Sequence, residues 1–384
     1  LDYRKVLAVR IALIHSYYSS RVPSGENNVV DAQLATLRAA GHEVQLIEQQ
    51  TDARLARKTY PVEAALTVAS GVGPSPLRQL LDFDPDVTHL HNLFPNFGRR
   101  WLTKYDGPLV ATLHNYRPLC AKATLYRDGH RCTECLDVGH SRPAIRHGCF
   151  HDSALATIPS AIATKFANDP VLRRAEVLTT LSEGMSNVYA DAGVPRDKLV
   201  VLNNYVEPIT VADLVPQQAP GYWIFAGRIE PEKGLHELIS AWPRGERLLV
   251  AGAVDPDRPL PAHPDVEALG RVPREELLAL MAGANGLAFP SIWLEGLALV
   301  CLESLAVGTP ILTFSDIPAG QAVQQLGVGL AGDRDDVPTL VARARGEFAS
   351  MRSRCKQVYA DEFTPQAWLR NAEAIYRTAI ERAG

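Results

Sequence analysis

Short, almost wholly apolar runs recur along the chain and alternate with longer segments whose apolar residues return every three or four positions. Such runs are typical of strands buried in a parallel sheet, and the segments between them are typical of its covering helices. In the first half the runs lie at residues 11–15, 43–47, 86–91, 109–114, 177–181 and 199–202. In the second half they lie at residues 223–226, 248–251, 266–269, 287–289 and 311–314. The alternation predicts an α/β fold with parallel sheets and right-handed crossovers.

The chain length of 384 residues suits two domains better than one. A stretch rich in Pro and Gln at 212–220 separates the two series of strands and predicts a linker. We expect a first domain over residues 1–207, with an insertion at about 117–152, and a second domain over 208–364. Apolar residues near one face of 365–384 predict a final amphipathic helix.

Composition narrows the functional classes. Hydrophobic residues make up 46% of the chain and charged residues 21%, as in ordinary globular proteins. A net charge of −4 argues against a general nucleic-acid binder. No apolar run approaches a membrane span, and no secretory signal precedes the first strand, so we expect a cytoplasmic protein.

The most informative stretch is Phe289–Leu312, FPSIWLEGLALVCLESLAVGTPIL, which places seven residues between Glu295 and Glu303. The pattern predicts a strand, a loop and a helix that starts near Gly296 and ends at Gly308. Backbone N–H groups at such a start form an anion site. Glu303, about two turns further in on an apolar helix, needs a partner: a ribose would supply one, and a neighbouring backbone is the alternative.

A second motif lies in Tyr222–Trp242, YWIFAGRIEPEKGLHELISAW. A predicted strand is followed by Gly227, Arg228, Lys233 and Gly234, and then by an amphipathic helix. Arg offers a planar fork of donors and Lys a point charge, and this pair at a strand-to-helix turn suits a diphosphate.

Taken together, the two motifs resemble those of family-4 retaining glycosyltransferases of the GT-B fold. The matching residues are Gly227, Arg228, Lys233, Gly234, Glu295 and Glu303. The resemblance implies two facing Rossmann-like, doubly wound domains, with the C-terminal helix crossing back onto the first. It also implies transfer of a sugar from a nucleotide diphosphate sugar, UDP- or GDP-type, to a hydroxyl acceptor on a glycan, a glycolipid or a secondary-metabolite sugar.

The resemblance further assigns roles on the donor side. Arg228 and Lys233 would neutralise the departing diphosphate without a catalytic metal, Glu295 would hold sugar hydroxyls and Glu303 the ribose. The backbone near Val272 would contact the base. Where the family usually has Gly-Phe-Gly after the first glutamate, this chain has Gly296-Leu297-Ala298. The resemblance therefore does not fix the orientation of the sugar pocket.

In the first domain, Ser24-Gly25-Glu26 stands where many family members carry Gly-Gly-Glu. Gly25 opens a predicted helix that runs to Ala40, and its N–H groups would face a donor phosphate. An ordinary helix N-terminus is the alternative. Gly25 and Glu26 are therefore candidate donor-binding residues.

Two adjacent predicted strands, 86–91 and 109–114, each end in a histidine, where open α/β sheets place their ligands. A bacterial subgroup of the family shows a similar THLHN and TLHNY pattern. The resemblance gives His114 a contact with the donor sugar near the reacting carbon, and makes His91, Asn92 and Asn115 acceptor-side candidates.

Four of the six cysteines lie within the insertion, at Cys120, Cys132, Cys135 and Cys149. The two-residue gap between Cys132 and Cys135 is typical of ligands that share one zinc ion. We expect a structural zinc site here, with nearby histidines able to replace one thiolate. Reduced, partly buried thiols or disulfides are the alternatives.

Other readings stay open. Basic residues Arg54, Arg57 and Lys58, in a helical region over 54–81, would allow contact with a membrane or an anionic acceptor, and a solvated charged face is the alternative. A sugar-nucleotide epimerase or hydrolase would use the same scaffold. A catalytically inactive sugar-nucleotide-binding protein is disfavoured by the four charged residues of the two motifs.

Overall fold

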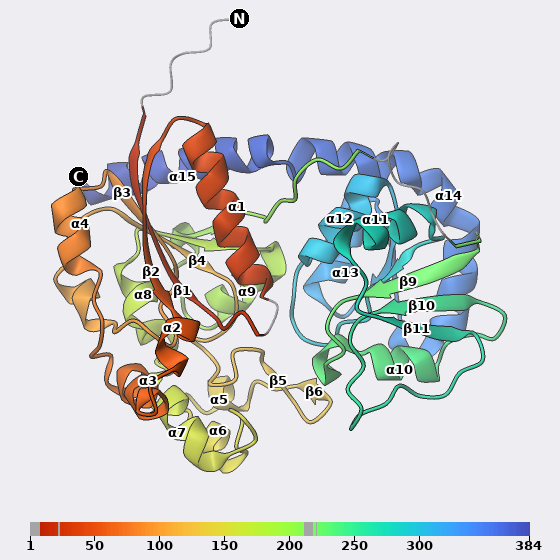
Figure 1. Cartoon of the computed structure of the whole chain (residues 1–384), viewed down its shortest axis with the longest axis horizontal. Coiled ribbons are helices and arrows are strands. Elements are labelled where there is room, and N and C mark those ends of the chain that lie inside the picture. The colour runs from red at the N-terminus through yellow and green to blue at the C-terminus, as the bar shows by residue number, and fades with distance from the viewer. Residues whose placement is uncertain (1–7, 22–23, 211–217, 220) are drawn as a thin grey trace, which may run out of the picture.

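The chain forms two six-stranded parallel sheets, each covered by helices, as the alternating pattern predicts (Figure 1). The structure is a computed structural model, and it describes residues 8–21, 24–210, 218–219 and 221–384. The expected linker at 212–220 lies outside the described residues except for 218 and 219.

The first sheet has the strand order β2-β1-β3-β4-β7-β8. Its strands occupy the six apolar runs expected in the first half of the chain. Their bounds are β1 Arg10–Tyr17, β2 Glu43–Gln50, β3 Val87–Asn92, β4 Leu109–Leu113, β7 Val177–Thr180 and β8 Leu199–Val201. Because both faces of a parallel sheet are covered, the central strands are buried along almost their whole length.

Helices pack on both faces of this sheet (Figure 1). The first begins at Gly25, with the Ser24 side chain accepting a hydrogen bond from the Asn27 N–H at 3.3 Å, and it ends before Gly41 at a φ of 90°. The region 54–81 is helical, as expected. The helices are α1 Gly25–Ala39, α2 Thr51–Leu55, α3 Tyr60–Ser70, α4 Leu77–Phe83, α8 Pro170–Arg174 and α9 Glu183–Asp191.

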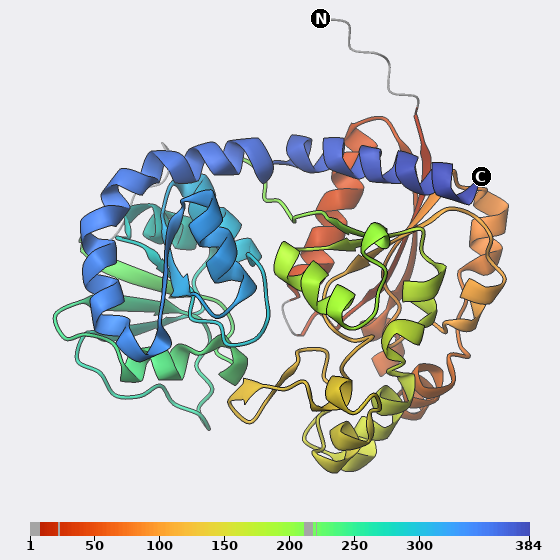
Figure 2. The ribbon, with the colours of Figure 1, turned by 180° about the vertical axis from the view of Figure 1, so that it is seen from behind.

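The segment between β4 and α8 forms a small lobe at one end of the first domain (Figure 1, Figure 2). A two-stranded antiparallel ribbon is followed by three short helices, and α7 packs against α3. The elements are β5 Tyr126–Arg127, β6 His130–Arg131, α5 Glu134–Asp137, α6 Arg142–Arg146 and α7 Ala154–Ala163.

The second sheet has the order β11-β10-β9-β12-β13-β14. Its strands are β9 Tyr222–Ala226, β10 Arg247–Ala251, β11 Val266–Gly270, β12 Leu287–Ala288, β13 Ile311–Phe314 and β14 Gly329–Gly332. The sequence analysis missed β14, because the segment GLAG carries no β-branched or aromatic residue. Its helices are η5 Pro231–Lys233, α10 Leu235–Ser240, α11 Arg274–Gly283, α12 Leu299–Val307, α13 Pro318–Leu326 and α14 Val337–Glu362.

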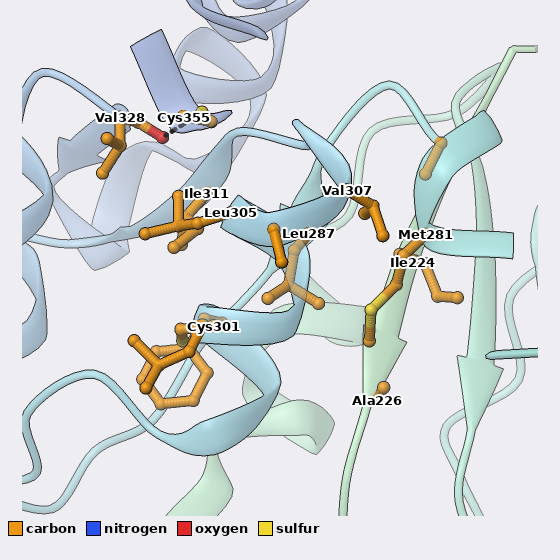
Figure 3. Close-up of a cluster of buried hydrophobic side chains, with 14 of the residues drawn as sticks. Ile224, Ala226, Met281, Leu287, Cys301, Leu305, Val307, Ile311, Val328 and Cys355 are labelled. Atoms are coloured by element: carbon orange, nitrogen blue, oxygen red, sulfur yellow. Dashed lines mark hydrogen bonds between the residues drawn. The ribbon is translucent and has the colours of Figure 1, made fainter. Parts of the chain in front are cut away.

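The core beneath α12 explains why its sequence is so apolar. Cys301, Leu305 and Val307 of this helix point into a cluster that includes Leu287 of β12 and Ile311 of β13 (Figure 3). The buried face fixes the helix against the sheet, and so fixes the position of Glu303 on its remaining side.

The final helix, α15 Pro365–Ala383, crosses from the second domain back to the first, as expected (Figure 2). The Thr364 side chain accepts a hydrogen bond from the Ala367 N–H and starts it. Trp368, Ala372 and Ile375 are buried against the first sheet. Burial of such side chains, at about 1.5–3 kcal/mol for each large one, holds the two domains together.

Among the described residues, none of the helices combines the length and the apolar character needed to cross a bilayer.

Candidate active site

The two domains meet beside the predicted catalytic residues. Tyr116 lies two residues after His114, and its hydroxyl donates a hydrogen bond to the backbone carbonyl of Leu294 at 2.7 Å. Leu294 directly precedes Glu295. This contact therefore joins the loop after β4 in the first domain to the motif loop of the second.

The motif loop itself differs from the expectation in one respect. The helix does not begin near Gly296: α12 starts at Leu299, after Ala298, which provides no side-chain cap. Gly296 lies in the preceding loop, where a Cβ would stand 2.7 Å from the Cβ of Ser182 in the first domain. The glycine thus permits close contact between the domains, and Glu303 sits about one turn into the helix rather than two.

Two helix N-termini face each other across the domain boundary. A Cβ on Gly25, the first residue of α1, would lie 3.7 Å from Cδ1 of Leu299, the first residue of α12. Both N-termini carry the positive end of a helix dipole and free backbone N–H groups. The space between them favours an anion such as a phosphate.

The Gly-Arg…Lys-Gly motif forms the loop between β9 and α10. Arg228 is exposed at the end of β9, whereas Lys233 is half-buried at the end of the 3-10 turn η5. Gly234 has a φ of 68°, and any side chain there would collide with the carbonyl of Pro290. This glycine therefore lets the Lys233 turn pack directly against the exit of β12.

Lys233 and Glu295 form a bidentate ion pair. The Lys233 Nζ lies 2.7 Å from Oε1 and 2.8 Å from Oε2 of Glu295, and the side chains are 16% and 11% exposed. The Ser291 hydroxyl also donates to Glu295 Oε1, and the ammonium lies 5.4 Å from the ring centroid of Trp293. The structure thus brings together two donor-side residues that the sequence assigned separate roles.

Glu303 contacts a cation that the sequence analysis did not single out. Its Oε1 accepts a hydrogen bond from Arg274 Nε at 3.1 Å. Burial raises the pKa of Glu303, and Arg274 partly offsets this effect. Arg274 opens α11 two residues after Val272, so its place directly after the predicted base-binding turn was the available signal.

Other donor-side candidates line the same region. Val272, Leu297 and Ala298 are half-buried and pack against the core of the second domain. Gly227 has a φ of 149° at the end of β9, and any side chain on Gly252 would collide with its carbonyl. The backbone of these turns therefore approaches closely at the carboxyl ends of the strands.

In the first domain, the histidines gather at the ends of β3 and β4. His91 Nδ1 lies 3.1 Å from His114 Nε2, so one nitrogen donates to the other. His89, which hydrogen-bonds the Tyr376 hydroxyl of α15 at 2.8 Å, stacks beside His91 with ring centroids 4.2 Å apart. The group is continued by His15, whose Nε2 lies 3.0 Å from Asn27 Oδ1.

Burial keeps these rings uncharged. It lowers the pKa of His114 and of His89 to about 3 and that of His15 to about 4, and it holds the pKa of His91 well below its ordinary value. Neighbouring histidines add to the effect at His91 and His114. At neutral pH these side chains can orient hydroxyl groups by hydrogen bonding, but they carry no positive charge.

Glu26 lies in the interior of the first domain, where its Oε1 is 4.0 Å from His15 Nδ1. Burial raises its pKa to about 7, although Arg117 and the amide of Asn92 act to lower it. These contacts place Glu26 among the acceptor-side candidates as well as at the N-terminus of α1.

Arg117 is the residue that the sequence analysis missed on this side. Its guanidinium stacks over the Phe94 ring at 3.6 Å. Among the described residues, its Nε and Nη1 are buried without a hydrogen-bond partner, as are Asn92 Nδ2 and His91 Nε2. Such donors are costly unless a ligand or water satisfies them. The run His114-Asn115-Tyr116-Arg117 was the available signal.

A cavity of about 110 Å³ adjoins these residues. Its polar lining includes His91, Asn92, His114, Asn115 and Arg117, and the Arg99–Asp169 ion pair also lines it. The Asn115 side chain is positioned by the N–H of Arg117, which donates to Oδ1 at 3.0 Å. Thr67 and Val68 of α3 and Ala163 of α7 lie in the remaining wall, where Arg99 donates a hydrogen bond to the backbone carbonyl of Ala163 at 3.0 Å. The cavity therefore offers hydrogen-bonding groups both at the strand ends and beneath the helices.

The four cysteines of the insertion line a separate cavity of about 20 Å³. Burial raises the pKa of the Cys135 and Cys149 thiols to about 11, and the other thiols of the group add to this. Among the residues that the structure describes, no three His, Cys, Asp or Glu side chains are arranged as metal ligands. Zinc binding by Cys120, Cys132, Cys135 and Cys149 stays a prediction.

Two family models match adjoining parts of the chain. The model described as Glycosyltransferase Family 4 matches residues 23–208, and the model described as Glycosyl transferases group 1 matches residues 210–345. The chain belongs to glycosyltransferase family 4. The match includes Gly25 and His114 in the first model and both charged motifs in the second.

Curated relatives of this family-4 chain differ in their named activities. Glycogen synthase of Mycobacterium tuberculosis (strain ATCC 25618 / H37Rv) is 27% identical over 278 residues, which cover 68% of this chain and 59% of the synthase. Phosphatidyl-myo-inositol mannosyltransferase of Mycobacterium leprae (strain TN) is 26% identical over 348 residues, which cover 83% of this chain and 82% of that protein.

Solved structures of glycosyltransferases share the whole fold. Sucrose-phosphate synthase from Thermosynechococcus elongatus matches with a TM-score of 0.68 at 17% identity, covering 97% of this chain and 99% of that one. The catalytic domain of starch synthase IV from Arabidopsis thaliana, bound to ADP and acarbose, matches with a TM-score of 0.63 at 13% identity, covering 97% and 100%. The expected GT-B architecture is confirmed.

Proposed function

We propose that this protein is a retaining glycosyltransferase that moves a sugar from a nucleotide diphosphate sugar to a hydroxyl acceptor. The observation that carries the proposal is the Tyr116–Leu294 hydrogen bond. It joins the loop that follows His114 in the first domain to the Glu295 loop of the second, which supports a site where a donor and an acceptor held by different domains would meet.

The donor would lie on the second domain, with its diphosphate between the N-termini of α1 and α12. Arg228 and Lys233 would bind the negative charge that develops as the diphosphate leaves, which is stabilisation of the transition state. These fixed cations would do this without a metal. Relatives such as the starch synthase bound to ADP support a nucleoside diphosphate, and we propose a UDP- or GDP-type donor here.

Glu295 would accept hydrogen bonds from sugar hydroxyls while it holds Lys233 in place. Glu303, with Arg274 beside it, would take the ribose. Val272 would contact the base through its backbone. The half-buried Leu297 and Ala298 would bring the backbone N–H groups at the start of α12 close to the donor.

The acceptor would occupy the first domain. His114 would contact the donor sugar near the reacting carbon, and His91, Asn92 and Asn115 would orient the acceptor hydroxyl. Because burial keeps His114 neutral, we propose that it positions the reactants by hydrogen bonds. The departing phosphate would then take the acceptor proton.

Mass spectrometry of nucleotide release tests this proposal. The full chain is incubated with a panel of nucleotide sugars, with and without candidate hydroxyl acceptors. The proposal predicts release of a nucleoside diphosphate together with a glycosylated acceptor. Release without an acceptor product would identify a hydrolase, and a changed sugar on intact donor would identify an epimerase; either result overturns the proposal.

A further inference from the structure

Two contacting helices of the first domain expose large apolar side chains. On α3 these are Val62 and Leu66, which are 64% and 63% exposed. On α7 they are Leu155, Ile158 and Ile162, at 79%, 37% and 46%. We call these five residues the α3–α7 face.

The spacing shows that each helix presents a stripe rather than scattered residues. Val62 and Leu66 are four apart, and Leu155, Ile158 and Ile162 follow at intervals of three and four, so each set lies on one side of its helix. The other sides of the helices carry buried residues, among them Thr67 and Thr157, and the two helices contact each other. Neighbouring exposed apolar stripes of this kind are typical of a membrane or protein contact.

The face lies over the proposed acceptor cavity. Thr67 and Val68 of α3 and Ala163 of α7 form part of the cavity wall, which His91 and His114 also line. The helices that carry the exposed face therefore also line the cavity. An acceptor held in this cavity would lie beside the α3–α7 face, so a hydroxyl head on an apolar anchor suits the two surfaces together.

The segments that include the face carry an excess of positive charge, although the whole chain has a net charge of −4. Residues 51–70 and 141–165, which include α2, α3, α6 and α7, hold six Lys or Arg and three Asp or Glu. These elements lie together at one end of the first domain in both views (Figure 1, Figure 2). The exposed cations are Arg57, Lys58, Arg142, Arg146 and Lys165.

We propose that the α3–α7 face docks on an anionic lipid bilayer, and that the acceptor is the hydroxyl head of a lipid-anchored molecule. Apolar side chains would enter the boundary between headgroups and acyl chains while the surrounding cations bind acidic headgroups. These exposed cations favour an anionic bilayer over a second copy of the chain, because the same cations on the second copy would repel them. The part concerning the acceptor rests on the proposed transferase function.

Vesicle sedimentation tests the docking surface with the full chain. We expect binding to vesicles of phosphatidylcholine with 30% phosphatidylglycerol, and binding about tenfold weaker or less to phosphatidylcholine alone or in 0.5 M salt. Leu155→Glu/Ile158→Glu should reduce binding at least tenfold. Leu81→Glu is the matched control, because Leu81 is 68% exposed on α4 and lies outside the face.

A second variant guards against misfolding. Arg142→Glu/Arg146→Glu changes only exposed side chains of α6 and should weaken binding to anionic vesicles without changing the circular dichroism spectrum. No vesicle binding by the wild-type chain, or equal binding by the Leu155→Glu/Ile158→Glu variant, would overturn the proposal. If light scattering shows that the wild-type chain is a dimer and that Leu155→Glu/Ile158→Glu is a monomer, the face would instead bind a second copy of the chain.

Calorimetry with UDP, GDP and ADP separates this inference from the proposed function. The α3–α7 variants should bind the preferred nucleotide as the wild type does, because their substitutions lie outside the second domain. A wild-type chain that binds vesicles but no nucleotide would overturn the donor site and the lipid-anchored acceptor, and would support docking alone.

Discussion

The Lys233–Glu295 ion pair offers the sharpest perturbation of the proposed donor site. Lys233→Met removes the charge but keeps an apolar stem of similar length beside Trp293. Among the described residues, the variant leaves the Glu295 carboxylate, 11% exposed, with the Ser291 hydroxyl as its side-chain hydrogen-bond donor. Its effects on folding and on turnover have different physical origins, and the two can be measured separately.

The expected loss of stability is moderate. Exposed ion pairs contribute about 0–1 kcal/mol, and breaking a fully buried pair costs about 3–5 kcal/mol. With 16% and 11% of the side chains exposed, this pair lies between the two, so we expect a loss of about 1–3 kcal/mol in the free energy of unfolding. Glu295→Gln in the same chain should restore part of it, because no unpaired charge then remains.

The expected loss of turnover is larger and independent of folding. Removing one charged donor from a departing diphosphate should lower kcat about 10²- to 10³-fold, or about 2.7–4 kcal/mol of transition-state stabilisation. The double variant should not recover it. Urea unfolding gives the stability, and nucleotide release per folded molecule gives kcat. Lys104→Met, at an exposed lysine of the first domain, is the matched control.

A kcat within threefold of wild type in folded Lys233→Met, or full recovery of kcat in the double variant, would refute a role for Lys233 in stabilising the departing diphosphate. Either result would give the pair a structural role alone.

Three further predictions address other parts of the site. Glu303→Gln should weaken binding of the bare nucleoside diphosphate at least tenfold in calorimetry and leave sugar preference unchanged, whereas Glu295→Gln should alter sugar preference; unchanged affinity in the Glu303 variant would remove the ribose role. His15, His89 and His114 have folded pKa values of about 4, 3 and 3, below the ordinary 6.5, so each ring should lower the stability as the pH is lowered below 6.5, by up to about 1.4 kcal/mol per pH unit. Glu26, with a pKa raised to about 7, acts in the opposite direction. Unfolding followed from pH 7.5 to 5 should therefore show a smaller loss of stability in His89→Gln than in the wild type, and equal losses would contradict a buried neutral His89. The insertion should carry one zinc ion per chain at Cys120, Cys132, Cys135 and Cys149, and removal of the zinc by a chelator should destabilise the chain without a direct effect on the chemistry. Less than about a tenth of an equivalent of zinc by elemental analysis, with all four thiols free, would exclude the zinc site.

The sheets were predictable because burial on both faces leaves a local signature. Every expected strand is present, and the run IALIH shows why: only a strand covered on both sides tolerates so little polarity. The start of α12 was misplaced because GLAL continues the apolar pattern through the loop without a capping side chain. The strand Gly329–Gly332 was missed because its backbone is paired but its side chains are small.

The site was predictable where chemistry lies within one motif, and less so where it depends on packing between distant segments. Gly227, Arg228, Lys233 and Glu295 could be selected as candidates from two short motifs and the family resemblance that these motifs carry. The approach of Arg117 to Glu26, or of Arg274 to Glu303, depends on how separate elements pack, and no local pattern encodes it. The exposed stripe on α7 was overlooked because an apolar helix of ten residues also suits a buried position.

The most direct test of sugar transfer with retention follows the anomeric carbon of the donor sugar through the reaction. A donor chosen from the nucleotide-sugar panel is labelled with ¹³C at the anomeric position and incubated with the full chain and an acceptor, and the label is observed by NMR. We expect the labelled carbon to leave the diphosphate and to appear in a new glycosidic bond with its anomeric configuration unchanged. An inverted configuration, a free reducing sugar or an epimerised donor would contradict it.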